Sequence, residues 1–139
     1  RKINESMPEY TVSLLAEELN KIGRSINSSA IGLYGIAYKK DIDDARESPA
    51  LEIARILQER GANLILYDPH ARHKNNVAGF EEFLTKSDYL IIATDHAEFR
   101  NVDLQKIKEN QIKIIIDGRN CLDKEKIQKL GITYKGIGR

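Results

Sequence analysis

The sequence predicts an α/β fold, a doubly wound parallel sheet of about five strands preceded by an N-terminal helix. Short, strongly apolar segments alternate with segments whose apolar residues recur at helical spacing. The connections between them are short, which favours parallel strands joined by right-handed crossovers. With 139 residues the chain has the length of one ordinary domain, enough for a single core. We therefore expect a Rossmann-like domain.

The first predicted element is a helix from Pro8 to Lys21, which Gly23 should end. Its apolar residues recur at helical spacing: Val12, Leu15, Leu19 and Ile22. We expect this helix to pack against the rest of the chain or against a neighbouring domain. The chain begins at Arg1 rather than at a methionine, and we expect it to be a piece of a longer protein or a processed form.

Strands and helices alternate after this first helix. The first strand is predicted at Ala30–Ile36, and Ser48 and Pro49 then mark a strong helix start, because serine caps helices and proline suits their first turn. The segment Tyr89–Ala93 is almost continuously apolar, as expected of a strand covered on both faces. The remaining predicted helices are Pro49–Arg60, Gly79–Lys86, Val102–Asn110 and Lys124–Leu130, and the remaining strands are Leu64–Tyr67, Lys113–Ile116 and Ile132–Tyr134.

The composition excludes several classes of protein. Hydrophobic residues make up 41% and charged residues 31%, a globular balance rather than a disordered one. The net charge of +1 lacks the basic excess of most nucleic-acid-binding domains. No apolar run approaches the length of about 18 residues that a membrane span requires. The single cysteine, Cys121, cannot form an internal disulfide, and we expect a cytoplasmic location.

A densely charged segment, residues 38–47, follows the first predicted strand. This places it at the carboxyl edge of the sheet, where open parallel sheets bind ligands. The helix that starts at Ser48 should direct its free N–H groups and positive dipole end to the same edge. Together with Lys39, Lys40 and Arg46, this predicts a site for phosphate oxygens, in which Arg46 offers a planar fork for anions.

Three carboxylates in the same segment leave alternatives open. Asp41, Asp43 and Asp44 would repel phosphate unless they pair with Arg46 or Lys40 or cap backbone N–H groups. Their spacing lacks the glycine turn and distal glutamate of an EF-hand, which disfavours a metal site. The alternative to a phosphate site is a solvated loop whose charges pair with one another. No GxGxxG motif follows the first strand, which argues against a self-contained NAD-dependent dehydrogenase.

Several motifs in order carry a family resemblance. They are GIAYKKDIDDARESPALEIARIL at 35–57, YDPH at 67–70, DGRN at 117–120 and YKGIGR at 134–139, preceded by NESMPEY at 4–10. Together they resemble the C-terminal, UDP-binding domain of the UDP-glucose/GDP-mannose dehydrogenases. The resemblance implies that residues 1–27 are the end of a helical middle, dimerisation region and that residues 28–139 are the UDP-binding domain.

The resemblance implies an activity for the longer protein. Members of this family are NAD-dependent enzymes that oxidise the C6 hydroxyl of a nucleotide sugar to a carboxylate in two hydride transfers. TDHAEF at 94–99, MPEY at 7–10 and the absence of tryptophan resemble the branch that acts on UDP-N-acetylhexosamines, especially UDP-N-acetylmannosamine, for polysaccharide precursors. The family also implies a homo-oligomer in which NAD is bound mainly by an N-terminal domain absent from this chain.

The same resemblance assigns roles by position in the motifs. Tyr38 and Lys39 match the substrate-contacting aromatic–lysine pair, and Arg119 matches an arginine that contacts the UDP-sugar. Arg46 matches an arginine that reaches the NAD pyrophosphate across the interdomain cleft. The family's catalytic cysteine lies in a glycine-rich segment that this chain lacks. We interpret Cys121 as a partly buried residue without a catalytic role. We therefore expect no catalytic residue in this chain, and we also expect no metal-binding residue.

Four further residues allow more than one interpretation. Asp68 stands where a ribose-binding carboxylate is common, but we favour a capping role because the glycine motif is missing. His96 either contacts a ligand or caps a short helix that starts at Ala97. We expect His70 and His73 to lie in a solvated basic loop, and the three histidines lack a zinc-like spacing.

Two other functions remain as hypotheses beside the half-enzyme. One is a stand-alone, non-catalytic nucleotide-binding or regulatory module of the same fold. The other is a receiver domain, which is weaker because Asp95 lies too late after strand three for a phosphoacceptor and the lysine-rich first loop has the wrong charge.

Overall fold

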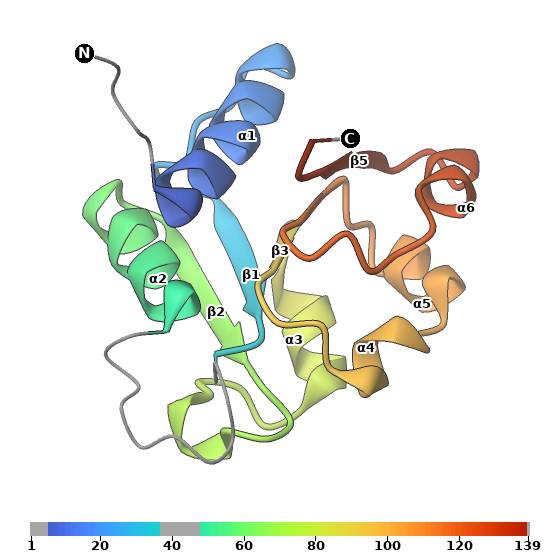
Figure 1. The fold of residues 1–139 in the computed structure, drawn as a ribbon. Coiled ribbons are helices and arrows are strands. Elements are labelled where there is room, and N and C mark those ends of the chain that lie inside the picture. Colours follow the sequence, from blue (N-terminus) through green and yellow to red (C-terminus); the bar gives the residue numbers. More distant parts are fainter. Residues whose placement is uncertain (1–5, 37–47, 139) are drawn as a thin grey trace.

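A computed structural model describes residues 6–36 and 48–138 and contains a five-stranded, all-parallel sheet with helices on both faces (Figure 1). The predicted doubly wound α/β fold with an N-terminal helix is confirmed. The strands are β1 (Ala30–Tyr34), β2 (Asn63–Tyr67), β3 (Tyr89–Ile92), β4 (Ile114–Asp117) and β5 (Thr133–Gly136). The helices are α1 (Met7–Lys21), α2 (Pro49–Glu59), α3 (Phe80–Lys86), α4 (Ala97–Arg100), α5 (Leu104–Glu109) and α6 (Lys124–Lys129), with a 3-10 turn at Arg72–Lys74.

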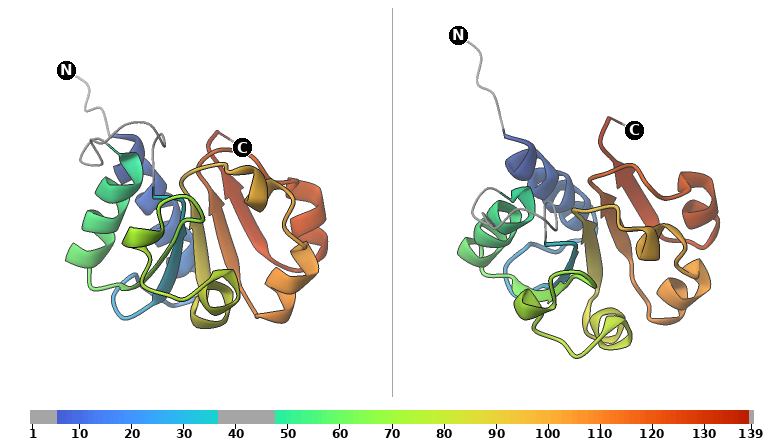
Figure 2. Two further views of the ribbon diagram at one scale, coloured as in Figure 1. Left: turned by 90° about the horizontal axis from the view of Figure 1, so that it is seen from below. Right: turned by 60° about the horizontal axis from the view of Figure 1, so that its bottom comes forward.

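The strand order is β2-β1-β3-β4-β5. The chain therefore steps from β1 outward to β2 and then returns to β3 on the other side of β1. In register, Ile31 of β1 lies opposite Leu64 of β2 and Tyr89 of β3. Because right-handed crossovers in opposite directions place their helices on opposite faces, α2 covers one face and α3 the other, as the views in Figure 2 show.

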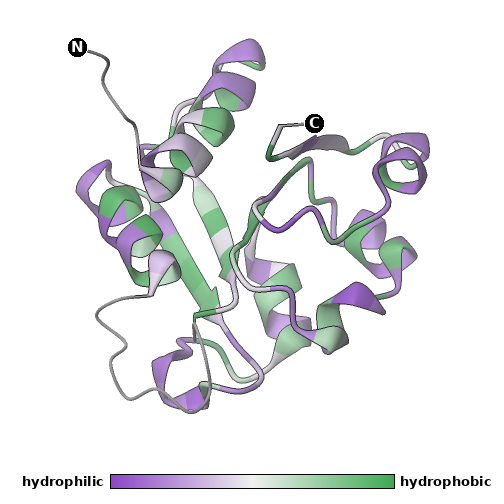
Figure 3. Ribbon diagram, in the orientation of Figure 1, coloured by the Kyte–Doolittle hydropathy of each residue, from purple (hydrophilic) through white to green (hydrophobic). Residues whose placement is uncertain are grey.

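Each face of the sheet carries its own apolar core. One core joins α1 and α2 to one set of strand residues, and the other joins α3, α4, α5 and α6 to the alternate set. Along β3, Tyr89 and Ile91 point into the first core while Leu90 and Ile92 point into the second, and all four are buried. The hydropathy colouring of the ribbon shows the same apolar interior (Figure 3). The prediction of a strand covered on both faces is thus confirmed.

Helix α1 is part of this core. Ser6 and Glu9 form a capping box at its start, since Glu9 N–H donates to Ser6 Oγ at 3.2 Å and Ser6 N–H donates to Glu9 Oε1 at 3.1 Å. Val12, Leu15 and Leu19 are fully buried against α2 and the sheet. The helix therefore completes the face that α2 alone would leave partly open. The domain boundary near residue 27 stays a prediction.

Two of the predicted boundaries shift because a backbone N–H bonds to an aspartate side chain. Strand β1 ends at Tyr34 rather than at Ile36, because Ile36 turns its N–H to the side chain of Asp68. Helix α5 begins at Leu104 rather than at Val102, because the carboxylate of Asp103 caps it by accepting the N–H of Gln105. Among the described residues, no helix has both the length and the apolar character needed to cross a membrane.

Candidate functional site at the carboxyl edge of the sheet

The carboxyl ends of β1, β3 and β4 lie next to one another at one edge of the sheet. The connection after β1 runs toward β2, whereas the connection after β3 runs toward β4 on the opposite side. Ligands of open parallel sheets bind where connections diverge in this way, because the divergence opens a crevice at the strand ends. The strand order therefore indicates the end of β1 and β3 as the place for a ligand.

The end of β1 approaches the end of β3 so closely that only glycine fits. Gly35 has a φ of +91°, and a Cβ there would lie 2.5 Å from Cβ of Thr94 and 2.7 Å from its backbone nitrogen. Ala93 N–H also donates to Tyr34 O at 2.8 Å. The floor of the crevice is therefore tightly packed.

The start of α2 is tied to the same edge through Ser48. This buried serine donates its hydroxyl to Ile36 O at 2.6 Å and accepts the N–H of Ala50 at 3.2 Å. The bond brings together Ile36 and Ser48, so both of these residues stand at the crevice. The predicted helix start at Ser48 is confirmed.

The start of helix α2 offers an anion fewer free N–H donors than the sequence predicted. Pro49 has no N–H, Ala50 N–H donates to the Ser48 hydroxyl, and Leu51 N–H donates to Ser48 O at 3.1 Å. The first turn therefore satisfies its own donors, and the expectation of free N–H groups is wrong for these residues. What remains is the positive end of the helix dipole, so hydrogen bonds to an anion must come from side chains.

The turn after β4 is organised by the buried carboxylate of Asp117. Its Oδ2 accepts the N–H groups of Cys121 and Leu122 at 2.8 and 2.9 Å and the hydroxyl of Tyr134 at 2.7 Å. Its Oδ1 accepts the N–H of Arg119 at 3.1 Å. These bonds fix the backbone of the DGRN motif, so that Arg119 stands at the carboxyl edge.

Gly118 fits this turn against β3. Its N–H donates to Ile92 O at 2.9 Å, and a Cβ at this position would lie 2.8 Å from the same oxygen. A larger residue would push the turn away from the strand, and Arg119 would move with it.

Arg119 and Asp95 line a small cavity at this edge. The cavity has a volume of about 60 Å³ and is lined by Ser48, Pro49, Ala50, Ala93, Thr94, Asp95 and Arg119. Arg119 Nε lies 3.8 Å from Asp95 Oδ1, and Arg100 donates to Asp95 Oδ2 at 2.6 Å. The Arg100 hydrogen bond holds the pKa of the Asp95 carboxyl below its usual range, so Asp95 is ionised at neutral pH. The Arg119 side chain is 47% exposed and accessible to a ligand.

The turn after β2 is organised by a second buried carboxylate, that of Asp68. Its Oδ1 accepts the N–H groups of His70 and Ala71, and its Oδ2 accepts the N–H of Ile36 at 2.6 Å. Oδ2 also lies 3.1 Å from Nε2 of His96. The capping role predicted for Asp68 is confirmed.

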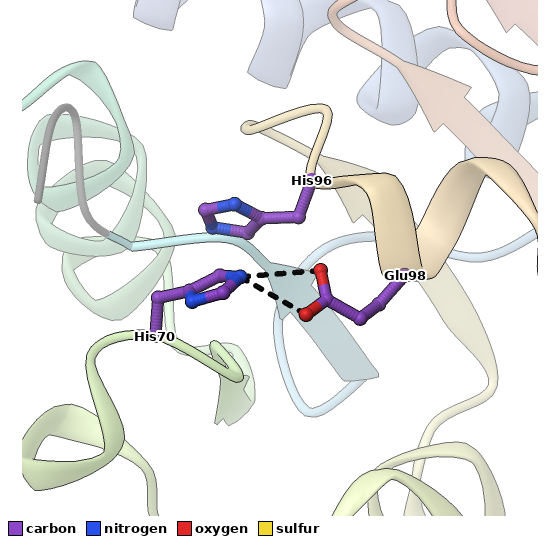
Figure 4. Close-up of side chains that lie close together, drawn as sticks. All are labelled: His70, His96 and Glu98. Atoms are coloured by element: carbon purple, nitrogen blue, oxygen red, sulfur yellow. Dashed lines mark hydrogen bonds and ion pairs between the residues drawn. The ribbon is translucent and has the colours of Figure 1, made fainter.

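For His96, the structure does not support the side-chain capping role, and ligand contact stays a prediction. It occupies the N-cap position of α4, but its side chain makes no capping hydrogen bond and instead meets Asp68. His70, expected in a solvated loop, pairs with Glu98, whose two carboxylate oxygens lie 3.2 and 3.0 Å from His70 Nε2 (Figure 4). The rings of His70 and His96 are 4.5 Å apart between centroids. These three side chains form a cluster beside the crevice, and they could hold a metal ion.

The structure describes one of the four predicted binding residues. Arg119 lies at the carboxyl edge, whereas Tyr38, Lys39 and Arg46 belong to segment 37–47, outside the described residues. Asp95 is a site residue that the sequence reasoning considered only as a phosphoacceptor. The signal that could have identified it is an acidic residue shortly after the end of a central strand.

Cys121 has the properties of an unreactive thiol. It is partly buried, and burial together with the neighbouring Asp117 carboxylate raises its pKa to about 12. Because the thiolate is the nucleophile, a thiol that keeps its proton at neutral pH is a poor one. The geometry agrees with its interpretation as a partly buried residue.

Comparison with known proteins finds relatives over the whole chain. The model of the UDP-glucose/GDP-mannose dehydrogenase family, UDP binding domain, matches residues 32–124. A UDP-N-acetyl-D-mannosamine dehydrogenase from Pyrococcus horikoshii is 39% identical over 140 residues, which cover 100% of this chain and 32% of the relative. A UDP-glucose 6-dehydrogenase from Rhizobium meliloti is 32% identical over 126 residues, which cover 84% of this chain and 29% of the relative. The chain thus spans about a third of the length of the curated relatives it matches.

Solved structures give the same result. An NDP-N-acetyl-D-galactosaminuronic acid dehydrogenase from Methanosarcina mazei Go1 superposes with a TM-score of 0.85 at 26% identity, covering 99% of this chain and 33% of that one. A UDP-D-ManNAc dehydrogenase from Pyrococcus horikoshii superposes with a TM-score of 0.82 at 35% identity, covering 95% and 31%. In both, the similar region is a part of a chain about three times as long.

Proposed function

The chain belongs to the UDP-glucose/GDP-mannose dehydrogenase family, and on this premise we propose that it is the UDP-sugar-binding part of an NAD-dependent nucleotide-sugar 6-dehydrogenase. One observation carries the proposal: the match to the family's UDP-binding domain, residues 32–124, contains the four described segments that border the crevice. Those segments are residues 35–36, 48–50, 93–96 and 117–121. The residues that shape the crevice are therefore those of the nucleotide-binding domain.

The diphosphate of the UDP-sugar would bind between the start of α2 and the turn after β4. Positive potential there comes from the helix dipole and from Arg119, whose Nε end is held near Asp95. Because the first N–H groups of α2 are already bonded to Ser48, cationic side chains supply the hydrogen bonds. Arg119 is the described candidate, and Tyr38 and Lys39 would contact the substrate from segment 37–47.

The chemistry of the intact protein would be oxidation of the sugar C6 hydroxyl to a carboxylate in two steps. NAD, bound mainly by an N-terminal domain outside this chain, would accept the hydrides, and Arg46 would reach its pyrophosphate across the cleft. A cysteine outside this chain would carry covalent catalysis. The present domain then contributes binding, orientation and exclusion of water rather than bond-making groups.

The sugar we propose is UDP-N-acetylmannosamine, and the product would serve polysaccharide precursor synthesis. Six relatives between 30% and 39% identical to this chain are named UDP-N-acetyl-D-mannosamine dehydrogenase, which supports this choice. We also propose that residues 1–27 end a helical dimerisation region, that the intact protein is a homo-oligomer, and that it acts in the cytoplasm.

Parallel assays of the intact protein that contains this chain test the proposal. NADH formation is measured with UDP-N-acetylmannosamine, UDP-N-acetylglucosamine and UDP-glucose at equal concentrations. We expect two NADH per sugar and the largest kcat/KM for UDP-N-acetylmannosamine. A preference for another of the three would correct the sugar alone. UDP binding without any oxidation would instead support the stand-alone nucleotide-binding module.

The role of Arg46 has its own test in the same protein. Arg46→Ala should raise KM for NAD by an amount worth about 1–3 kcal/mol, the scale of a charge-assisted hydrogen bond. Unchanged saturation by NAD would refute this role while leaving UDP-sugar binding intact.

A further inference from the structure

We propose that His70, His96 and Glu98 form a binding site for a divalent transition-metal ion of the Zn²⁺ class. Each of the three side chains offers one ligand atom, and these atoms all lie within 4.8 Å of one another (Figure 4). His70 comes from the turn after β2, and His96 and Glu98 come from the start of α4. This cluster shares no residue with the lining of the cavity of Asp95 and Arg119.

The donor set determines the class of ion. Two imidazole nitrogens and one carboxylate oxygen are ligands that Zn²⁺, Co²⁺ and Ni²⁺ accept, whereas Mg²⁺ and Ca²⁺ prefer oxygen ligands alone. Small movements of exposed side chains would bring the three atoms to coordination distance, because His70 and Glu98 are surface residues that already contact each other. Three protein ligands leave a fourth tetrahedral position for water.

A buried carboxylate next to the cluster supports this assignment. Asp68 is completely buried, and its Oδ2 lies 3.1 Å from His96 Nε2. Metal-binding histidines commonly bond through their second nitrogen to a carboxylate, which fixes the ring and increases its basicity. If the ion bound Nε2 itself, the same carboxylate would stand close enough to add negative charge to the site. Asp68 therefore orients the His96 ring when the ion binds the other ring nitrogen, and adds charge to the site when the ion binds Nε2.

The hydroxyl of Tyr34 is a second, independent observation. Within residues 6–36 and 48–138, it is a buried side-chain polar atom without a hydrogen-bond partner. Its ring packs on that of His96, with centroids 6.1 Å apart. Buried donors of this kind require an acceptor, and a water bound to the metal ion would provide one.

The fold explains why spacing along the chain gives no zinc signature. His70 and His96 follow β2 and β3, the two strands that flank β1, and all three strands end level in the sheet, so the residues after β2 and β3 can meet at the end of β1. An ion there would connect the turn after β2 to α4. Binding should therefore raise the melting temperature, since a ligand that binds only the folded state stabilises it.

Titration of the 139-residue chain with Zn²⁺ and Co²⁺ tests the proposal, after removal of any affinity tag and of bound metal by chelation. We expect one Zn²⁺ per chain with a micromolar or tighter Kd in calorimetry, a rise in melting temperature, and a visible Co²⁺ spectrum of tetrahedral type. His70→Asn and Glu98→Gln should each weaken Zn²⁺ binding by about tenfold or more, since each removes one of three ligands.

The matched control is His73→Asn, because His73 lies in the same turn, is exposed, and stands outside the cluster. This variant should bind Zn²⁺ like the original chain. Both cluster substitutions concern exposed side chains, so folding is preserved and is checked by circular dichroism. The proposal is overturned if the chain binds no Zn²⁺ at micromolar concentration, or if the cluster variants and the control bind equally well.

Discussion

The turns after β2 and β4 are both organised by a buried aspartate, but the two aspartates have different roles. Each contains an aspartate that is completely buried, Asp68 in one and Asp117 in the other, and each carboxylate accepts several backbone N–H groups of its own turn. Buried carboxylates are tolerated because their oxygens are so thoroughly bonded. From the sequence, the two aspartates look equivalent.

They differ in the bonds made outside their turns. Asp68 reaches two other elements, the N–H of Ile36 after β1 and the ring of His96 at α4. Asp117 reaches one other residue, the hydroxyl of Tyr134 in β5. Asp68 therefore holds separate parts of the carboxyl edge together, whereas Asp117 shapes the single turn that carries Arg119. One carboxylate maintains the crevice, and the other positions Arg119, for which we propose contact with the UDP-sugar.

The largest effect should come from Asp68→Asn. An amide keeps one acceptor oxygen, so either the N–H of Ile36 or those of His70 and Ala71 would face an NH₂ group. We expect a loss of about 2–4 kcal/mol in the free energy of unfolding, the cost of unpaired buried donors. Urea unfolding measures it.

Asp123→Asn is the matched control, because Asp123 is an exposed cap of α6 and asparagine caps almost as well as aspartate. Its loss should stay below about 0.5 kcal/mol. If Asp68→Asn and Asp123→Asn lowered the free energy of unfolding equally, the claim that Asp68 joins separate elements would be wrong.

Gly35→Ala should follow in size, because it affects the end of β1, which Asp68 holds. A Cβ at Gly35 would clash with Thr94, and the positive φ disfavours any side chain. We expect a loss of about 2–3 kcal/mol from strain and repacking.

Gly79→Ala provides the comparison for this effect. Gly79 has open space around its Cβ position and an extended backbone, so alanine there should change stability by about 1 kcal/mol or less. Thermal unfolding of both variants gives the difference. If Gly35→Ala were as mild as Gly79→Ala, the tight approach of β1 and β3 would not be a constraint.

A smaller effect is expected for Asp117→Asn. An amide oxygen in place of Oδ2 keeps the three bonds to Cys121 N–H, Leu122 and Tyr134, whereas the N–H of the exposed Arg119 and the weakly donating thiol of Cys121 lose their acceptor. The loss should be about 1–2 kcal/mol in urea unfolding. Asp117→Asn should thus remain milder than Asp68→Asn, and the reverse order would contradict the contrast between the two turns.

Cys121, in the same turn, allows a chemical test that involves no substitution. With a pKa of about 12, the thiol keeps its proton at pH 8, whereas an unfolded cysteine with a pKa of about 8.5 is partly ionised. Alkylation at pH 8 should therefore be at least about 100-fold slower in the folded chain than in concentrated urea. Rapid labelling of the folded chain would show that the turn after β4 leaves the thiol accessible and reactive.

The sequence predicted the layers of this fold well, because the apolar periodicity and the helix caps are local signals. The start of α2 at Ser48 and Pro49 and the buried β3 both depend on neighbouring residues alone. The end of β1 was predicted two residues too late, because it depends on Asp68, which is distant in sequence. Contacts of this kind have no local signature.

The candidate site was predicted unevenly for the same reason. Arg119 was found through its motif, and the structure places it at the crevice. The contact between Arg119 and Asp95 was not predicted, because an ion pair between two loops depends on the strand order. The contact of His70 with Glu98 was missed likewise, because the two residues belong to turns after different strands.

The central claim is that a nucleotide diphosphate binds at the edge where Arg119 and the start of α2 meet. Calorimetric titration of the intact protein with UDP tests it most directly, with Arg119→Ala compared to Arg55→Ala. Arg55 lies on α2 and pairs with Glu52 and Glu59 on the exposed helix surface. The account predicts UDP binding at least about tenfold weaker for Arg119→Ala and unchanged for Arg55→Ala, since a charge-assisted hydrogen bond contributes about 1.5–3 kcal/mol. Equal affinity of both variants and the unmodified protein would contradict it.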